Sequence, residues 1–137
     1  MSQATQTLTV ALVAPLTGVL VPIEQVPDAV FAEKMVGEGI SIDPLSNVLV
    51  APCDGEVALI HPSMHAVTIR HDTGLEVLLH IGLDTVAMRG SGFTPKVSLG
   101  AKVKRGDPLI EFDLDKVATT AKSLLTQMVI SNSDILS

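Results

Sequence analysis

The chain has 137 residues, 47% of them hydrophobic, with no Trp or Tyr and only three Phe, which predicts one domain with an aliphatic, strand-favouring core. A single cysteine, Cys53, excludes an internal disulfide framework and fits a reducing, cytoplasmic compartment. The net charge of −6 argues against nucleic-acid binding, and the proline and glycine interruptions of the apolar N-terminal run argue against direct membrane insertion.

Two segments of the first half of the chain resemble each other. LVAPLTGVLVPIE begins at Leu12 and LVAPCDGEVALIH begins at Leu49, and both contain V-A-P-x-x-G followed by an apolar run. Each predicts a strand, a Pro-Gly bend and a second strand. Two copies indicate a duplicated β unit, whereas a solenoid would need at least three.

Short elements follow in chain order. A short helix is predicted between the two repeats over Asp28–Met35, with Asp28 as its N-cap. Further strands are predicted at Ala66–Arg70, Leu75–His80, Val97–Leu99 and Pro108–Phe112. A helix from Leu114 to about Gln127 is predicted near the end, capped by Asp113 or Asp115.

Many short strands with glycine and proline corners define the expected fold class. We predict an all-β protein, an antiparallel β-sandwich or barrel with duplicated β units and one or two short helices. No linker or low-complexity tract divides the chain, so residues 1–137 are expected to form a single domain.

Two histidines flank the turn signal Asp72-Thr73-Gly74. With a two-residue loop, paired positions sum to 145 and His65 lies directly opposite His80, so that the imidazoles touch. A three-residue loop with a bulge at Gly74 shifts the sum to 146 and places Ala66 opposite His80. Both registers remain open at this level.

Facing imidazoles favour the neutral form, because like charges destabilise each other. A neutral ring leaves one nitrogen free to act as a nucleophile toward phosphorus or as a metal ligand. A neighbouring imidazole N–H can then stabilise phosphoryl oxygens. The competing interpretation is that these histidines are structural residues held in place by hydrogen bonds.

Several segments match a known family in order and spacing. They are APLTGVLVPIEQVPDAVFAEKMVGEGISIDP, VAPCDGEV, HAVTI, DTGLEVLLHIGLDTV, GFTPKVSLGAKVKRGDPLIEFD and VISNSD, between Ala14 and Asp134. In them the chain resembles the glucose-type enzyme IIA family of the bacterial phosphoenolpyruvate-dependent sugar phosphotransferase system. The family pattern continues with a further strand segment, so the resemblance also predicts that the last C-terminal strand segment is missing.

The resemblance implies a phosphocarrier with an antiparallel β-sandwich fold. Nε2 of His80 would accept the phosphoryl group from the carrier HPr and pass it to a sugar-specific IIB domain, with a IIC permease downstream. His65 would support the phosphoryl group, the hydroxyl of Ser63 would help to orient His65, and Asp28 and Asp84 would lie at the rim of the site. No cofactor is required for such a transfer, although His65 and His80 are possible ligands of a zinc ion.

The docking surface departs from the family pattern. Leu78, Val67 and His61 stand where relatives often have phenylalanine, whereas Phe31 is retained. An apolar rim of Phe31, Val67 and Leu78 is expected to dock partners, including possible regulatory protein targets. The sugar, glucose or N-acetylglucosamine among others, is left open.

Three other functions compete with this interpretation. A zinc hydrolase needs an H-x-H pair, but Ile81-Gly82 follows His80, and His61 and His71 are interpreted as surface residues near loops. A lipoyl- or biotinyl-type carrier needs a lysine at a hairpin tip, which Lys102 and Lys104 do not provide. A regulatory or zinc-binding β-domain without phosphotransfer is the remaining alternative.

Overall fold

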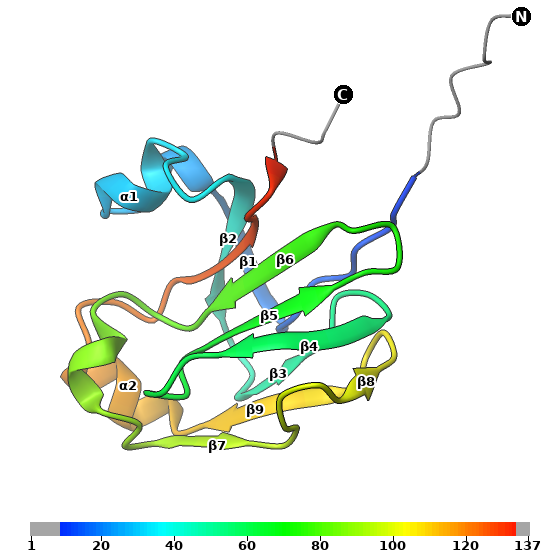
Figure 1. Ribbon diagram of the computed structural model, residues 1–137. Helices are drawn as coiled ribbons and strands as arrows, with labels where there is room; N and C mark the ends of the chain where they lie inside the picture. Colours follow the sequence, from blue (N-terminus) through cyan, green and yellow to red (C-terminus); the bar gives the residue numbers. More distant parts are fainter. Residues whose placement is uncertain (1–8, 134–137) are drawn as a thin grey trace, which may run out of the picture.

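The computed structural model describes residues 9–133, and its elements are coloured along the chain in Figure 1. The strands and helices are, in order, β1 (Gly18–Pro22), η1 (Ile23–Gln25), α1 (Ala29–Ala32), β2 (Glu38–Pro44), β3 (Val48–Val50), β4 (Gly55–Ile60), β5 (Ala66–Arg70), β6 (Glu76–His80), η2 (Thr85–Met88), β7 (Phe93–Pro95), β8 (Lys102–Val103), β9 (Pro108–Phe112), α2 (Leu114–Thr120) and β10 (Thr126–Ile130).

The strands form two antiparallel sheets. The larger sheet has seven strands in the order β1-β2-β10-β6-β5-β4-β8, and the smaller has three in the order β3-β9-β7. Figure 1 shows the small sheet lying against one side of the large one. Helix α1 lies near β2 of the large sheet, and α2 lies at the end of β9 of the small sheet. The predicted all-β antiparallel sandwich with few short helices is confirmed.

The main core lies between the two sheets. Strand β6 shows why: Val77 and Leu79 are fully buried, while the alternate residues Leu78 and His80 are only partly buried. Because side chains alternate between the faces of a strand, His80 belongs to the opposite face of the large sheet. There a second apolar cluster forms, with members Ile23, Val26, Phe31, Leu83 and Val129.

The two repeated segments pair with each other. The backbone N–H of Val13 donates to the carbonyl of Pro52, and that of Val50 donates to the carbonyl of Pro15, both at 2.9 Å. These two bonds connect equivalent positions of the V-A-P motif in opposite senses, so the repeats meet about a local two-fold axis. The two copies of the predicted β unit are therefore direct neighbours that pair through equivalent residues.

The glycine of each repeat allows close strand pairing. Gly18 begins β1 and Gly55 begins β4. A Cβ at either position would collide with a backbone carbonyl of the neighbouring strand, that of Asp43 or of Arg70. The absence of a side chain is therefore required at both positions.

Both predicted helices are shorter than expected. The Asp28 side chain accepts a hydrogen bond from Val30 N, which confirms the N-cap, but α1 covers only Ala29–Ala32. Asp113 caps α2, which ends at Thr120, so the prediction that this helix extends to Gln127 is wrong. The chain instead enters β10, where hydrogen bonding to two neighbouring strands outweighs the local helical pattern.

The β5–β6 hairpin follows the second of the two predicted registers. Ala66 lies opposite His80 and Arg70 opposite Glu76, with Gly74 at φ +93° in the loop. The predicted strand Val97–Leu99 is also wrong, because this segment lies in the turn region between β7 and β8. The expectation of a missing last strand segment concerns the chain beyond the described residues.

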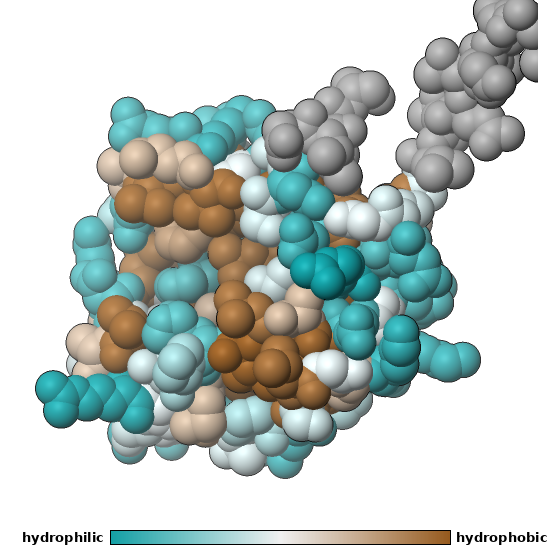
Figure 2. Space-filling view, viewed as in Figure 1, coloured by the Kyte–Doolittle hydropathy of each residue, from teal (hydrophilic) through white to brown (hydrophobic). Residues whose placement is uncertain are grey.

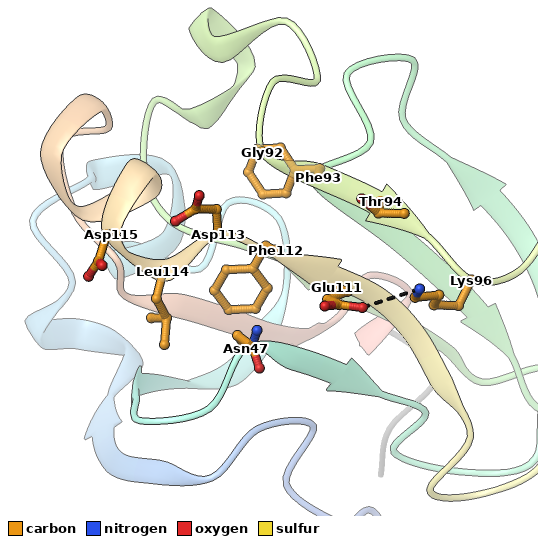
Figure 3. A pocket seen from close by; sticks show the side chains of 10 residues that line it. All are labelled: Asn47, Gly92, Phe93, Thr94, Lys96, Glu111, Phe112, Asp113, Leu114 and Asp115. Carbon is orange, nitrogen blue, oxygen red and sulfur yellow. Dashed lines mark ion pairs between the residues drawn. The ribbon is translucent and has the colours of Figure 1, made fainter.

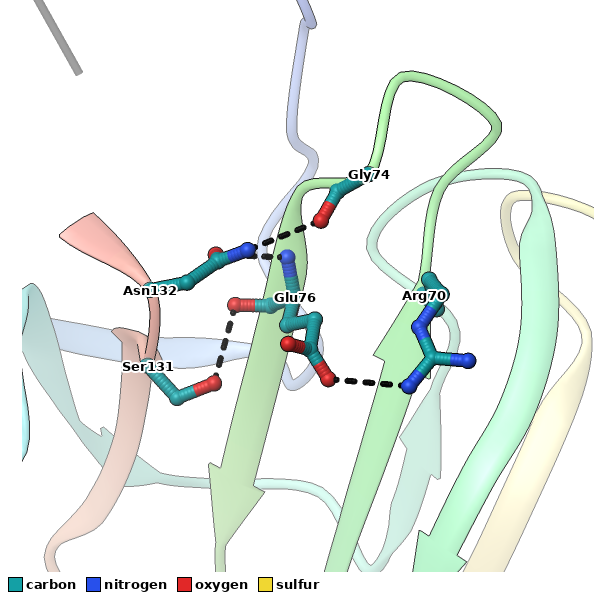
Figure 4. A network of polar contacts seen from close by, with 5 residues as sticks. All are labelled: Arg70, Gly74, Glu76, Ser131 and Asn132. Carbon is teal, nitrogen blue, oxygen red and sulfur yellow. Dashed lines mark hydrogen bonds and ion pairs between the residues drawn. The ribbon is translucent and has the colours of Figure 1, made fainter. Parts of the chain in front are cut away.

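Ser131 and Asn132, directly after β10, bind the far end of this hairpin (Figure 4). Asn132 accepts a hydrogen bond from Glu76 N at 2.9 Å and donates one to the carbonyl of Gly74 at 2.8 Å. Glu76 also forms an ion pair with Arg70 at 3.3 Å. The segment following β10 is thus joined to the loop side of β6, at the end opposite His80.

Candidate functional site

His80 is the last residue of β6 and lies at the junction of three strands. Ala66 of β5 and Gln127 of β10 are its cross-strand neighbours. The ring of Phe31, from α1, packs against it with centroids 5.1 Å apart. The acceptor predicted from the sequence is therefore held on a rigid sheet beside α1.

The tautomer of His80 follows from its hydrogen bond. Nδ1 lies 2.9 Å from the carbonyl oxygen of Gly82, and a carbonyl can only accept, so Nδ1 carries the proton. In the neutral ring Nε2 then keeps its lone pair. This arrangement leaves Nε2 as the nucleophilic nitrogen or as a metal ligand.

His65 contacts His80 although the two are not in direct register. It lies just before β5, where its carbonyl accepts a hydrogen bond from Ile81 N at 2.9 Å. Met64 before it has φ +62° and turns the chain at this point. The two rings meet edge to face, with centroids 4.8 Å apart and an interplanar angle of 81°.

Both rings are neutral near pH 7. Burial, followed by the neighbouring His80 and His61, lowers the pKa of His65 to about 4. Burial also lowers the pKa of His80, against opposing effects of the Gly82 carbonyl, the Gln127 side chain and Asp28. The pair can therefore provide a free nitrogen and an N–H donor together.

The aromatic side chains of the protein gather around this pair. All three Phe belong to one chain of rings, since Phe93 lies 6.3 Å from His65 and 6.5 Å from Phe112, and Phe31 packs on His80. His61 also packs on His65 at 4.5 Å. Rings with few rotatable bonds therefore pack against both imidazoles, which favours a fixed geometry.

The predicted supporting residues are placed as follows. Asp28, the α1 N-cap, is near enough to His80 to raise its pKa, whereas Asp84 is exposed and makes no hydrogen bond to His65 or His80 among the described residues. Among the described residues, the Ser63 hydroxyl forms no hydrogen bond to His65. The backbone of Ser63 interacts with His61 and His65 instead.

The predicted docking residues divide between the two faces of the large sheet. Leu78 and Phe31 share the face of His80, but Val67 is 1% exposed and packs in the core between the sheets. The prediction that Val67 docks partners is therefore wrong, because its position in β5 points to the opposite face from Leu78. Beside Phe31, the exposed Val30 and Met35 add to the apolar surface around α1 visible in Figure 2.

The positions of two residues at the site differ from the sequence prediction. The resemblance counts His61 among the docking positions and its local sequence predicts a surface residue, but it is partly buried against His65. The helical pattern includes Gln127, but this residue is fully buried in β10 opposite His80. Only the pairing of distant strands brings Gln127 to the site, whereas the spacing of His61 and His65 around a proline turn is a signal that the sequence contains.

Some polar atoms near the site are buried without partners. Within residues 9–133 these are His65 Nδ1, Ser41 Oγ and Gln127 Oε1. Ser41 and Gln127 are cross-strand neighbours, so a polar row runs across β2, β10 and β6 to His80. A buried polar atom without a partner costs stability.

A surface pocket lies elsewhere, over the small sheet (Figure 3). Its lining includes Phe93 and Phe112, and an ion pair of 3.2 Å joins Lys96 to Glu111 at one end. No set of three or more His, Cys, Asp or Glu in the described residues is arranged to hold a metal ion. His65 and His80 have the ligand type that zinc prefers but are only two.

None of the helices in residues 9–133 has the length and apolar character needed to cross a membrane. The fold and the site define a small antiparallel β-sandwich with a neutral histidine pair, in which one ring nitrogen has a fixed lone pair. Comparison with known proteins identifies the family to which this class belongs.

The sequence model of the family described as phosphoenolpyruvate-dependent sugar phosphotransferase system, EIIA 1, matches residues 10–136. The glucose-specific EIIA component of Bacillus cereus is 50% identical over 123 residues, which cover 90% of this chain and 74% of that protein. The counterpart from Staphylococcus epidermidis is 48% identical over 125 residues, 91% of this chain and 75% of that protein.

The fold comparison agrees. The structure of glucose permease IIA from Mycoplasma capricolum superposes with a TM-score of 0.88 at 38% identity, covering 90% of this chain and 80% of that one. The chain belongs to the EIIA 1 family of the phosphoenolpyruvate-dependent sugar phosphotransferase system.

Proposed function

We propose that this protein is a phosphocarrier that accepts a phosphoryl group on Nε2 of His80 from phospho-HPr and passes it to a sugar-specific IIB domain. The observation that carries the proposal is the hydrogen bond from His80 Nδ1 to Gly82, which leaves the Nε2 lone pair free in a neutral ring. The lowered pKa of His80 keeps that nitrogen unprotonated near neutral pH.

In the proposed transfer the Nε2 lone pair forms the new N–P bond. The N–P bond to the donor histidine breaks, and its electron pair stays on the donor nitrogen. The His80 ring then carries a positive charge, which the Gly82 carbonyl stabilises through Nδ1–H. His65, at 4.8 Å, would provide an N–H to the phosphoryl oxygens, and the incoming dianion would raise the pKa of His65.

The partners are inferred from the family and from the apolar surface. Val30 is 43% exposed and Met35 is 71% exposed next to the buried Phe31, and this surface around α1 would dock HPr and the IIB domain in turn. The relatives named for glucose support glucose as the transported sugar, with a IIC permease downstream. The protein would act in the cytoplasm and need no cofactor.

Phosphorus NMR after incubation with phosphoenolpyruvate, enzyme I and HPr tests the proposal. We expect a phosphohistidine signal from this protein that is lost in His80→Ala, because the variant lacks the nucleophile. Circular dichroism checks that the variant is folded. A signal that persists in His80→Ala would place the acceptor elsewhere, and no signal in the unaltered protein would refute phosphotransfer.

A further inference from the structure

His61 is a third histidine at the site to which the proposed mechanism gives no role. It follows β4 directly, and its backbone N–H donates to the carbonyl of Ala66 at 2.9 Å. Its own carbonyl accepts a hydrogen bond from Met64 N at 2.7 Å. The turn between β4 and β5 is thus closed at both ends, which holds the His61 ring against His65.

The proton of His61 has a defined position. The backbone N–H of Ser63 donates to Nδ1 of His61 at 3.0 Å, so Nδ1 provides the lone pair and the neutral ring carries its proton on Nε2. His61 therefore presents a fixed N–H donor. His80 has the opposite arrangement, with its proton on Nδ1 and its lone pair on Nε2.

The location of His61 suits an incoming phosphoryl group. His65 is 2% exposed, whereas His61 and His80 are both partly exposed, so a group arriving from solvent meets these two rings at the mouth of the site. The ring centroids of His61 and His65 are 4.5 Å apart, and those of His65 and His80 are 4.8 Å apart. His61 also lies within electrostatic reach of His80.

A phosphoryl dianion needs several donors around its three oxygens. The charged or titratable groups that act on His65 and His80 in the described part of the chain are the three histidines of the site and Asp28. None of these groups is a Lys or Arg. The imidazole N–H groups of His61 and His65 are therefore candidate donors beside the acceptor nitrogen, together with the buried amide of Gln127.

We infer that His61 is a catalytic residue of this protein, whose Nε2–H hydrogen-bonds the phosphoryl group on His80 beside the donor provided by His65. The inference rests on the proposed phosphotransfer and deepens it. During transfer His61 keeps its proton: the N–P bond forms at His80 Nε2, the donor N–P bond breaks, and His61 stabilises the charge on the oxygens.

The test measures single-turnover transfer from purified phospho-HPr to three variants. His61→Phe keeps a flat ring but removes the N–H, and it should slow transfer about tenfold to a hundredfold, the usual effect of losing one hydrogen bond to a charged group. His61→Gln restores an amide N–H and should recover part of the rate.

His71→Phe is the matched control. As in His61, Nδ1 of His71 accepts a hydrogen bond from the backbone N–H two residues later, that of Thr73 at 3.2 Å, but His71 lies at the tip of the hairpin. It should transfer at the unaltered rate. A second readout is independent of rate: in the ¹⁵N-histidine-labelled protein, the Nε2–H resonance of His61 should shift on phosphorylation, with coupling to phosphorus, and that of His71 should not.

The outcomes separate the two proposals. If the unaltered protein accepts no phosphoryl group, the proposed function fails. If it accepts the group on His80 but His61→Phe and His71→Phe both match it, only the role of His61 is overturned. Slower transfer in His61→Phe without a change in the His61 Nε2–H resonance on phosphorylation would also overturn it, since docking alone would then explain the rate.

Discussion

At the scale of single residues, the site depends on keeping imidazoles uncharged inside the fold. His65 is almost fully buried, and its Nδ1 has no hydrogen-bond partner among the described residues. Its pKa of about 4 in the folded protein lies below the ordinary value of 6.5 that the unfolded chain would show. Between these values the unfolded state binds more protons, so the free energy of unfolding must fall as pH falls.

This linkage predicts a pH effect that can be assigned to one residue. Between pH 7.5 and 5, His65 should account for a loss of about 2 kcal/mol in the free energy of unfolding. His65→Phe has no titratable group at this position. In urea titrations at the two pH values, its free energy of unfolding should therefore fall by about 2 kcal/mol less than that of the unaltered protein. Equal losses with and without His65 would contradict the assignment.

At the scale of elements, β10 connects the site to the rest of the sheet. It pairs with β2 on one side and β6 on the other, and it brings Gln127 opposite His80. Just beyond its end, Asn132 makes two hydrogen bonds to the backbone of the β5–β6 hairpin. The position of β6, and therefore of His80, depends on a strand some fifty residues later in the chain.

Removing the Asn132 side chain tests this connection. Asn132→Ala should lower the free energy of unfolding by about 2 kcal/mol, because it removes two hydrogen bonds, a partly buried one from Glu76 N and an exposed one to the Gly74 carbonyl. Ser131→Ala is the neighbouring control: its hydroxyl makes one long bond of 3.4 Å in an exposed setting and should cost less than about 0.5 kcal/mol. Equal effects in urea unfolding would show that Asn132 does not fasten the hairpin.

At the scale of the whole molecule, one core joins both sheets. Val57 and Ile69 of the large sheet and Leu49, Leu109 and Phe112 of the small sheet are buried members of a single cluster. A site on the large sheet should therefore lose its structure together with the small sheet, in one cooperative transition.

Leu109→Ala tests this cooperativity from the small sheet. Leu109 is fully buried, so the substitution should lower the free energy of unfolding by about 2–5 kcal/mol, whereas Leu59→Ala, at an exposed position, should cost less than about 1 kcal/mol. Circular dichroism and the NMR signals of the site histidines should report the same midpoint in urea. Separate midpoints would mean that the sheets unfold independently.

Local signals in the sequence were sufficient for several features. Ala66–Arg70 and Pro108–Phe112 form strands with the predicted bounds, and Asp28 and Asp113 cap the two α-helices. These features depend on short-range preferences: runs of β-branched and aliphatic residues, breaks at glycine and proline, and side chains that accept hydrogen bonds from the first helical turn.

What the sequence by itself determined is the fold class, the repeated unit and the two histidines of the pair, because alternation, turn chemistry and residue type are written locally. Tertiary structure alone decided the ends of both helices, the burial of Val67, and the position of Gln127 beside His80. Those outcomes depend on which distant strands pair and which face of the sheet each residue occupies. Strand pairing is a competition over the whole chain, and a short window of sequence does not contain its result.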